Sequence, residues 1–266
     1  MLGLGTSINR GEFVASESLL LDEHSGASAA YSLRKISSSY SGNAIKVRRN
    51  GDNAELNIGF SSGVLDTSAI ATHCGSNDGF VTTWYDQSGN ANNATETNFA
   101  KQPKIYDGSS TAVEVVNGKP ALLSDADVTL SIPLSTTAGY LIFGVSKIDR
   151  NSIFLGSENN ADFVLVAQSG NTSTSINANS TINTVRKNGA SHTLTNRGAL
   201  FTDFSSQHLI HIDVDLTFSN ANMQLGYNNA GQYPMFTTQE LIFYPDTASI
   251  SVTAIETDIN TFYSIF

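Results

Sequence analysis

Trp84-Tyr85-Asp86-Gln87-Ser88-Gly89-Asn90 is the most informative segment of this chain. It follows the β-type run Phe80-Val81-Thr82-Thr83 and leads into the polar sequence Ala91-Asn92-Asn93-Ala94. Two large aromatic residues followed by Asp, Ser, Gly and Asn are typical of a strand that leaves a core and turns sharply. The segment therefore predicts a strand that ends at Trp84 and a tight turn directly after it.

Beyond Trp84, short β-type runs alternate with turn signals such as Asn117-Gly118, Ser169-Gly170-Asn171, Asn188-Gly189 and Asn228-Asn229-Ala230-Gly231. The alternation predicts strands at Lys104–Tyr106, Val113–Val116, Ala121–Leu123, Val128–Ile132, Tyr140–Lys147, Ser152–Leu155, Asp162–Ala167, Ile182–Arg186, Leu209–Leu216, Met223–Gly226 and Gln239–Tyr244. Many short strands at this spacing are typical of a sandwich or jelly roll, so we expect an all-β fold.

Short helices are expected at both ends of this fold. The alanine-rich segment Ala27–Ile36 predicts an N-terminal helix, because its apolar residues share one side and its last turn is basic. Helical spacing from Val252 to Tyr263 predicts a C-terminal helix, with a capping box at Thr253-Ala254-Ile255-Glu256. We therefore expect an irregular N-terminal arm over residues 1–18 and a single jelly-roll domain over residues 19–266.

Two further local patterns precede Trp84. Ala44–Arg48 and Glu55–Phe60 both alternate, which predicts a hairpin that turns at Asn50-Gly51-Asp52-Asn53. Thr67–Cys74 predicts a short helix, because Asp66 directly before it can cap its N-terminus.

Composition limits the partners of this protein. Of its 266 residues, 40% are hydrophobic and only 14% are charged, well below the roughly 25% that is usual in globular proteins. The net charge is −10 and the isoelectric point is near 4.8. Both values argue against binding to nucleic acid or to an anionic membrane surface, since both need a basic face. Neutral partners, such as glycans or other proteins, stay open.

The cysteine count and the N-terminus point to folding in a reducing cytoplasm. Cys74 is the only cysteine, which excludes an intrachain disulfide. The segment Met1–Arg10 lacks the basic start and apolar core of a signal peptide. No stretch approaches the roughly 18–20 apolar residues of a membrane-spanning helix.

Residues from about 30 to 107 resemble the N-terminal part of the catalytic domain of fungal α-L-arabinofuranosidases of the AbfB type. The matching stretches are Ala30-Tyr31-Ser32-Leu33-Arg34, Ser39-Tyr40-Ser41-Gly42, Val47-Arg48-Arg49, Asp52-Asn53-Ala54 and Tyr85-Asp86-Gln87-Ser88-Gly89-Asn90, with a weaker continuation at Asn117-Gly118-Lys119-Pro120. This resemblance implies a concanavalin-like jelly-roll β-sandwich.

A second resemblance is to virion structural proteins of tailed bacteriophages. The stretches that carry it are Met1–Ser7, Ala29–Lys35, Glu240–Tyr244 and Ile255–Asn260. Such proteins carry the same sandwich as a tail or capsid-surface module and are often trimeric. This resemblance implies a location in the virion after synthesis in the host cytoplasm, and an N-terminal arm that anchors the protein or exchanges between subunits of a homotrimer.

The first resemblance also tells where catalytic carboxylates should stand. The family's nucleophilic glutamate begins an apolar strand that ends in Leu-Gly, and the best match here is Asn151–Gly156, with Asn151 in the glutamate's place. The family's acid is an aspartate in a loop after a second Leu-Gly, which here reads Leu225-Gly226-Tyr227-Asn228-Asn229. An amide can neither attack nor supply a proton. We therefore expect no catalytic residues, no cofactor and no enzyme activity.

Other side chains could form an alternative site. Asp203, Asp213 and Asp215 form the nearest carboxylate cluster, which we interpret as a solvated strand face. His208 and His211 lie three residues apart on a strand, so they point to opposite faces and cannot share a metal ion. We expect no metal site. Ser88 lacks a nucleophile-elbow pattern and is interpreted as a turn residue, and Cys74 as a small buried hydrophobe.

The weak candidates for ligand binding lie in the opening segment. Trp84 and Tyr85 could stack on a sugar ring. Asp86 and Asn90, together with Asn92, could supply oxygen ligands to calcium, although no full ligand set is present. We prefer a structural turn for these residues.

Three functions compete on these observations. The leading hypothesis is a non-catalytic virion protein, exposed on the particle, that either decorates the capsid or binds host surface glycan and contacts other capsid or tail proteins. The alternatives are an arabinofuranosidase-like glycoside hydrolase and a free carbohydrate-binding domain. The sandwich by itself does not separate them, because it hosts many functions.

Overall fold

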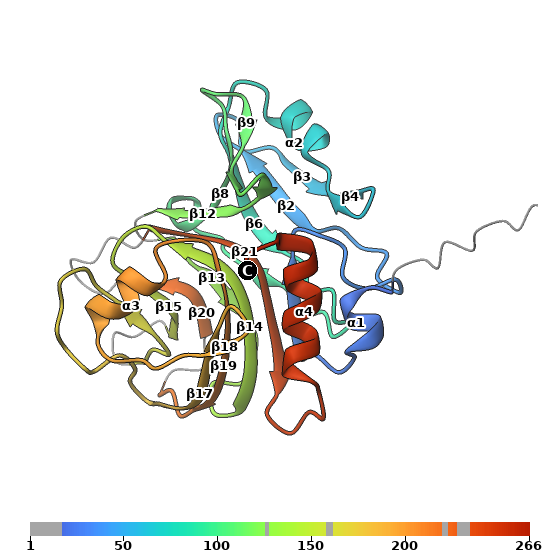
Figure 1. Ribbon diagram of the computed structural model, residues 1–266. Coiled ribbons are helices and arrows are strands. Elements are labelled where there is room, and N and C mark those ends of the chain that lie inside the picture. Colours follow the sequence, from blue (N-terminus) through green and yellow to red (C-terminus); the bar gives the residue numbers. More distant parts are fainter. Residues whose placement is uncertain (1–17, 126–127, 158–161, 220–222, 228–234) are drawn as a thin grey trace, which may run out of the picture.

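The computed structural model describes residues 18–266 except 126–127, 158–161, 220–222 and 228–234. Its strands form a β-sandwich with few helices, shown in Figure 1. The expected all-β fold is thereby confirmed. The N-terminal arm lies outside the described residues except for Ser18, and the division of the chain at residue 18 stays a prediction.

The first layer of the sandwich is an antiparallel sheet in the order β18, β17, β19, β14, β21, with β1 and β12 sharing the far edge of β21. Its strands are β1 (Ala29–Ser32), β12 (Leu122–Asp125), β14 (Gly139–Ile148), β17 (Ser180–Lys187), β18 (Ala190–Ser191), β19 (His208–Leu216) and β21 (Met235–Pro245). The first strand of the chain therefore pairs with the last one.

The second layer runs in the order β16, β15, β20, β13, β7, β6, β2, β3. Its strands are β2 (Ile45–Arg49), β3 (Glu55–Ile58), β6 (Gly79–Trp84), β7 (Ala94–Thr95), β13 (Leu130–Ile132), β15 (Ser152–Ser157), β16 (Val166–Ala167) and β20 (Met223–Tyr227). Strand β8 (Lys104–Asp107) pairs with both β6 and β12 and so joins the two layers. Short strands complete the hairpins: β4 (Phe60–Ser61), β5 (Val64–Leu65), β9 (Ala112–Val113), β10 (Val115–Val116) and β11 (Lys119–Pro120).

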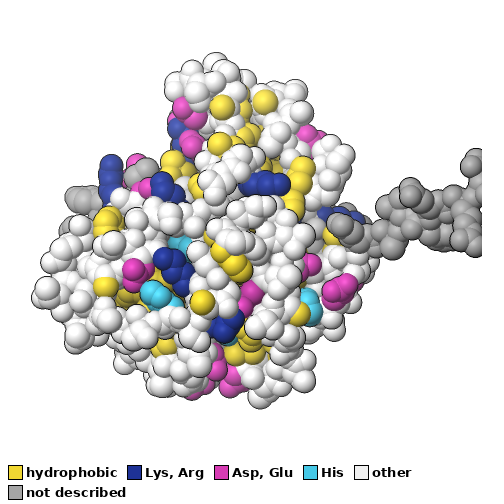
Figure 2. Space-filling model, viewed as in Figure 1, with side chains coloured by type: hydrophobic (Ala, Val, Ile, Leu, Met, Phe, Trp, Pro, Cys, Tyr) yellow, Lys and Arg dark blue, Asp and Glu magenta, His cyan; other side chains and the backbone are white. Residues whose placement is uncertain are grey.

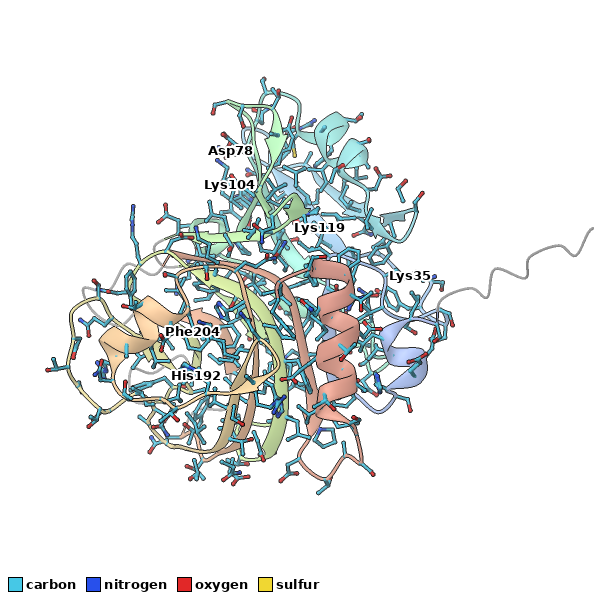
Figure 3. All side chains as sticks on the ribbon, viewed as in Figure 1. Lys35, Asp78, Lys104, Lys119, His192 and Phe204 are labelled. Atoms are coloured by element: carbon cyan, nitrogen blue, oxygen red, sulfur yellow. The ribbon has the colours of Figure 1, made fainter. Side chains whose placement is uncertain are left out.

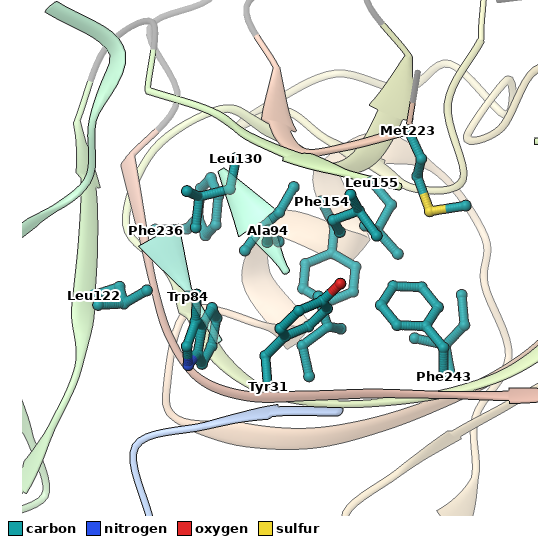
Figure 4. Packing of buried hydrophobic residues seen from close by; sticks show 14 of the residues in the cluster. Tyr31, Trp84, Ala94, Leu122, Leu130, Phe154, Leu155, Met223, Phe236 and Phe243 are labelled. Atoms are coloured by element: carbon teal, nitrogen blue, oxygen red, sulfur yellow. The ribbon is translucent and has the colours of Figure 1, made fainter. Parts of the chain in front are cut away.

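The main core fills the space between the layers. Alternation along each strand sends one set of side chains inward, for example Ile210, Ile212 and Val214 of β19. Tyr31 and Trp84 are fully buried in this core, with ring centres 5.7 Å apart, as Figure 4 shows. Trp84 therefore serves the packing of the two layers against each other.

A second core covers the outer side of the first layer. Helix α4 (Val252–Tyr263) lies across that sheet beside α1 (Leu20–Glu23), and its Ile255 and Ile259 are fully buried there. The expected C-terminal helix is confirmed. Its N-cap differs from the expected one. The Ser251 hydroxyl accepts the hydrogen bond from the Ala254 N–H at 3.4 Å, whereas the expected capping box begins at Thr253.

A buried ion pair ties α4 to the sheet beneath it. The Arg34 guanidinium donates to both carboxylate oxygens of Glu240 on β21, at 2.9 and 3.1 Å, and to Asp258 on α4, at 2.9 Å. The Glu240 side chain is 1% exposed. Because breaking such a pair leaves an uncompensated buried charge, Arg34 fixes the relation between the two elements.

The expected helix over Ala27–Ile36 is wrong. Residues Ala29–Ser32 form strand β1, with Ala29 and Tyr31 in the inner core and Ala30 in the outer one. Pairing with β21 satisfies this backbone, so burial on two faces overrides the helix propensity of alanine. The N-terminal helix of the structure is the single turn α1.

Several local predictions agree with the structure. Helix α2 (Thr67–Cys74) begins as expected, with the Asp66 carboxylate accepting the Ala69 N–H at 3.0 Å. Strands β2 and β3 form the expected hairpin. Helix α3 (Arg197–Asp203), capped by Asn196, was not predicted, nor was the short 3₁₀ turn Phe99–Lys101. In the part of the chain that the structure describes, no helix combines the length and the hydropathy needed to cross a membrane.

The turn after Trp84 is built around the buried carboxylate of Asp86. One oxygen accepts the N–H groups of Ala30 on β1 and of Ser88, both at 2.8 Å, and the other accepts the Ser88 hydroxyl at 2.7 Å and the Asn92 N–H at 3.0 Å. A carboxylate that accepts several hydrogen bonds forms strong, charge-assisted contacts. Asp86 thereby fixes the turn and joins it to β1.

The neighbouring amides complete this junction. The Gln87 side chain accepts the Ile36 N–H at 3.0 Å and donates to the carbonyls of Ser32 and Arg34, at 3.1 and 3.0 Å. Asn90 donates to the carbonyl of Ala27 at 2.9 Å. These side chains satisfy backbone N–H and C=O groups at the edge of β1 away from β21 and in the chain segments before and after it.

We expect Asp86→Asn to lower the free energy of unfolding by about 3 kcal/mol, because an amide nitrogen would face buried N–H donors and leave them without an acceptor. Urea unfolding followed by Trp84 fluorescence measures this change. Glu55→Gln is the matched control, since it breaks only the exposed pair with Lys46 and should cost less than about 1 kcal/mol. Equal effects of the two substitutions would contradict the role given to Asp86.

Candidate functional site

One end of the sandwich carries the start of β15 and the end of β20, the two positions where the arabinofuranosidase resemblance places catalytic carboxylates. Strand β15 begins directly after Asn151, and its Ile153 faces Tyr227 at the end of β20. At the same end, Asp125 closes β12 opposite Met235, where β21 begins. Four strands from both layers therefore meet beside Asn151.

The charged residues at this end include two aspartates close to Asn151. Asp149 pairs with Lys147, and its side chain is 22% exposed. Asp125 lies 3.6 Å from the Arg150 guanidinium and is 56% exposed. The Asn151 side chain accepts the N–H of Ser169 at 2.7 Å, so it orients the loop that follows β16. The end of the sandwich thus carries carboxylates, each held by a cation.

The end of β20 bends sharply into this region. Gly226 has a φ of +73°, and a Cβ at this position would lie 2.7 Å from the carbonyl oxygen of Val128 and 2.9 Å from the Phe236 ring. Only glycine fits such a close approach at a positive φ. The Leu225-Gly226 pair therefore serves the backbone path, and the Asn228-Asn229 pair of the sequence comparison lies outside the described residues.

The structure gives mainly structural roles to the four ligand-binding candidates Trp84, Tyr85, Asp86 and Asn90. Trp84 and Asp86 are buried, at 0% and 3% exposure. The Tyr85 hydroxyl donates to the Asn57 side chain at 2.8 Å, and the Asn90 amide is bound to backbone carbonyls. The Asp86 oxygens already accept N–H and O–H groups, which is incompatible with calcium ligation at the same atoms. Ligand binding by Tyr85 and Asn90, which stay partly exposed, remains a prediction.

The acidic cluster expected at Asp203, Asp213 and Asp215 is divided. The Asn183 amide bridges Asp213 and Asp215 at 3.2 and 3.1 Å on the sheet surface, whereas Asp203 closes α3 and lies 3.2 Å from His192. The three carboxylates therefore do not form one site. Among the residues that the structure describes, no group of three His, Cys, Asp or Glu side chains is placed to hold a metal ion.

The two histidines of β19 lie on opposite faces of the sheet, as expected. His211 stacks on Phe143 beneath α4, at 4.6 Å between ring centres. His208 points between the layers, where its Nδ1 donates to the Ser206 carbonyl at 3.0 Å and its Nε2 accepts from the Ser146 hydroxyl at 3.1 Å. Both members of this Ser-His pair are 2% exposed and lie among apolar side chains, so a substrate cannot reach them.

Ser88 and Cys74 follow their expected structural roles. The Ser88 hydroxyl donates to Asp86 within the turn, and Cys74 is buried in the main core. Burial raises the pKa of the Cys74 thiol above its ordinary value. Neither side chain is therefore placed as a nucleophile.

Comparison with known proteins agrees with this architecture. A family described as alpha-L-arabinofuranosidase B, catalytic, matches residues 22–152. No curated protein matches the chain. An arabinofuranosidase complexed with arabinofuranosyl-α-1,2-xylobiose is similar in structure, with a TM-score of 0.57 and 16% identity over 90% of this chain. A mutant of a GH54 α-L-arabinofuranosidase soaked with 4-nitrophenyl α-L-arabinofuranoside is similar as well, with a TM-score of 0.56 and 14% identity over 90% of this chain.

These findings define the class of fold. The chain carries a β-sandwich like that of the AbfB and GH54 arabinofuranosidase catalytic domain. It spans 64% of the length of each of these two solved structures. The family match ends at Ser152, the first residue of β15, and so reaches the strand end beside Asn151.

Two expectations from the sequence are overturned here. The non-catalytic reading is wrong, because the matching family is a catalytic domain and the similar structures are those of arabinofuranosidases. The terms virion, bacteriophage, capsid and tail find no support in any of these matches. The phage resemblance rested on short stretches, of which Ala29–Lys35 and Glu240–Tyr244 belong to the paired strands β1 and β21 or directly follow them, so they reflect the sandwich.

Stability should fall in mild acid because of His208. Burial lowers the pKa of His208 to about 4, whereas an unfolded imidazole titrates near 6.5. Between these values only the unfolded state binds the proton, so the stability present above pH 6.5 is lost progressively as the pH falls towards 4, by about 3 kcal/mol. Urea unfolding at pH 7 and pH 4.5 should show a smaller loss for His208→Gln than for the wild type. His24→Gln should lose as much free energy of unfolding between pH 7 and pH 4.5 as the wild type. An equally large loss in His208→Gln would refute this account.

Proposed function

We propose that this chain is an arabinofuranosidase-like glycoside hydrolase domain that removes α-L-arabinofuranosyl groups from a glycan. The match between residues 22–152 and the arabinofuranosidase catalytic family carries the proposal. The sandwich, which is similar to those enzymes over 90% of this chain, supports it. A neutral sugar substrate is also compatible with a net charge of −10.

The chemistry needs two carboxylates that flank the scissile bond, one to attack or activate water and one to donate a proton to the leaving oxygen. Asn151 cannot do either, because an amide neither attacks nor titrates in the useful range. Asp149, directly after β14, and Asp125, the last residue of β12, are the carboxylates that the described residues supply beside it. We assign the carboxylate pair to them.

The environments of the two aspartates suggest different roles. Asp149 is the less exposed of the two and pairs with Lys147, so it is assigned to attack on the sugar or to activation of water. Asp125 is more exposed, and its Arg150 contact of 3.6 Å is longer than a hydrogen bond. Asp125 is therefore assigned to proton transfer with the leaving oxygen.

Release of 4-nitrophenol from 4-nitrophenyl α-L-arabinofuranoside tests the assignment. Wild-type protein should turn the substrate over, and Asp149→Asn and Asp125→Asn should each lower kcat at least about 100-fold, the contribution of a positioned acid or base. Asp213→Asn is the matched control, because Asp213 contacts Asn183 on the sheet surface away from this end. Sustained turnover in both aspartate variants would reject the assigned pair, and no turnover on a panel of aryl glycosides would reject the activity.

The position of Asn151 gives a second test. If the start of β15 lies against the scissile bond, Asn151→Glu should raise kcat by about tenfold or more, because it places a second carboxylate able to attack beside Asp149. Asn151→Gln lengthens the side chain equally but keeps the amide, so it should not raise kcat. Equal effects of the two substitutions would remove Asn151 from the site.

A further inference from the structure

A groove runs along the edge of the first sheet, away from the Asn151 end. It has a volume of about 810 Å³, within the usual range of ligand sites. Its walls come from β17, from the segment 174–177 before it, and from the segment 191–194 that follows the β17–β18 turn. In Figure 1 these elements lie in the lobe that also carries α3.

The lining of this groove combines neutral polar side chains with an aliphatic base. The aliphatic side chains Ile176, Ile182, Val185 and Leu194 pack against the main core. Hydroxyl and amide groups line the groove as well, from Thr174, Asn177, Ser180, Thr181, Asn183, Thr184, Ser191 and Thr193. Thr181 and Thr184 lie opposite Asp215 and Asp213 in the register, so they are on the other face of β17 from Ile182 and Val185, and the groove reaches both faces at the sheet edge. Within the described ranges, the hydroxyls of Thr181, Thr184 and Thr193 have no hydrogen-bond partner in the protein and so are available to a ligand.

The charged groups of the groove are already neutralised by the protein. The Arg186 guanidinium donates to both oxygens of Glu256 on α4, with contacts between 2.8 and 3.1 Å, and Glu256 is 2% exposed. His192 lies 3.2 Å from the Asp203 carboxylate, in an orientation that forms no hydrogen bond, and packs edge-on against Phe204 (Figure 3). Figure 2 shows both acidic and basic side chains at the surface of the lobe that carries α3. The side chains that line the groove therefore offer no free cation to an anionic ligand. The nearest carboxylates, Asp213 and Asp215, lie beside Thr184 and Thr181 and accept hydrogen bonds from the Asn183 amide.

We infer that this groove is a binding site for a neutral polysaccharide chain, separate from the proposed catalytic end. Sugars present hydroxyl groups around rings whose C–H faces are apolar, and the groove supplies hydroxyl and amide partners and aliphatic side chains at one sheet edge. None of its lining residues belongs to the cluster of Asp125, Asp149 and Asn151. The inference goes beyond the proposed activity, because holding a chain here requires no chemistry.

A peptide strand is the other occupant that an edge strand can take. The register of β17 against β19 shifts between Ile182 and Thr184, in the middle of the groove. Such a bulge interrupts the row of backbone groups that strand addition requires. Toward its end, β17 is also covered by β18, which pairs with Arg186 and Lys187. The sheet edge is therefore less suited to a strand than to a ligand that uses side chains.

Affinity gel electrophoresis with neutral arabinoxylan in the gel tests the inference, in the Asp149→Asn variant so that hydrolysis does not interfere. The polysaccharide should retard the protein. The further double substitution Thr181→Ala/Thr184→Ala should raise the Kd about tenfold or more, because it removes two exposed hydrogen-bonding groups. Thr95→Ala/Thr217→Ala, which changes two exposed threonines outside the groove, should leave the Kd unchanged.

The remaining outcomes separate this inference from the proposed activity. Retardation by polygalacturonate as strong as that by arabinoxylan would overturn it, because it would show that charge governs binding. So would the absence of retardation, or retardation that is unaffected in Thr181→Ala/Thr184→Ala. Release of 4-nitrophenol by the wild type, with no retardation of Asp149→Asn, would support the hydrolase activity and reject the groove as a binding site. Retardation without any release of 4-nitrophenol would support the binding site and reject the activity.

Discussion

The buried carboxylate of Asp86 is the contact on which the arrangement of this sandwich depends. It closes the turn after β6 and, through Ala30, holds β1, the strand that joins the beginning of the chain to β21. Gln87 extends the same junction to Ser32 and Ile36. Because Tyr31 of β1 and Trp84 of β6 pack together in the main core, these polar contacts and the apolar packing of the two layers depend on each other.

The residues of this junction also carry the resemblance to the arabinofuranosidases, so the resemblance reflects the scaffold more than the catalytic groups. Residues Tyr85 to Asn90, which lie inside the family match, build the scaffold, and Asp149, which is assigned to chemistry, lies at the end of the match, near Asn151. The same stretch can thus be retained for stability while the site at the strand ends changes. An amide at one expected position therefore does not exclude an enzyme, since neighbouring carboxylates are supplied by Asp149, between β14 and β15, and by Asp125 at the end of β12.

The sequence predicted the architecture well because alternation and turn residues are local signals. Helix α2, the β2–β3 hairpin and the long strands β14, β19 and β21 could all be located from them. Segments governed by distant contacts could not. Ala29–Ser32 reads as a helix until β21, more than two hundred residues away, pairs with it, and α3 has a weak pattern that only its packing reveals. At the site, the sequence comparison located Asn151 but not the meeting of β12 with β14 and β15, because strand neighbours far apart in the chain leave no periodic signal.

The pairing of β1 with β21 has a consequence for the order of events during synthesis. While the ribosome makes the chain, β1 emerges more than two hundred residues before β21, the strand that covers its edge, and before the helix α4 that shields Ala30. Loop closure over such a span is slow, as is usual for folds dominated by non-local contacts. The nascent protein therefore exposes an uncovered edge until β21 has been made, and a chaperone that shields this edge would affect yield more than one that acts on the finished sandwich.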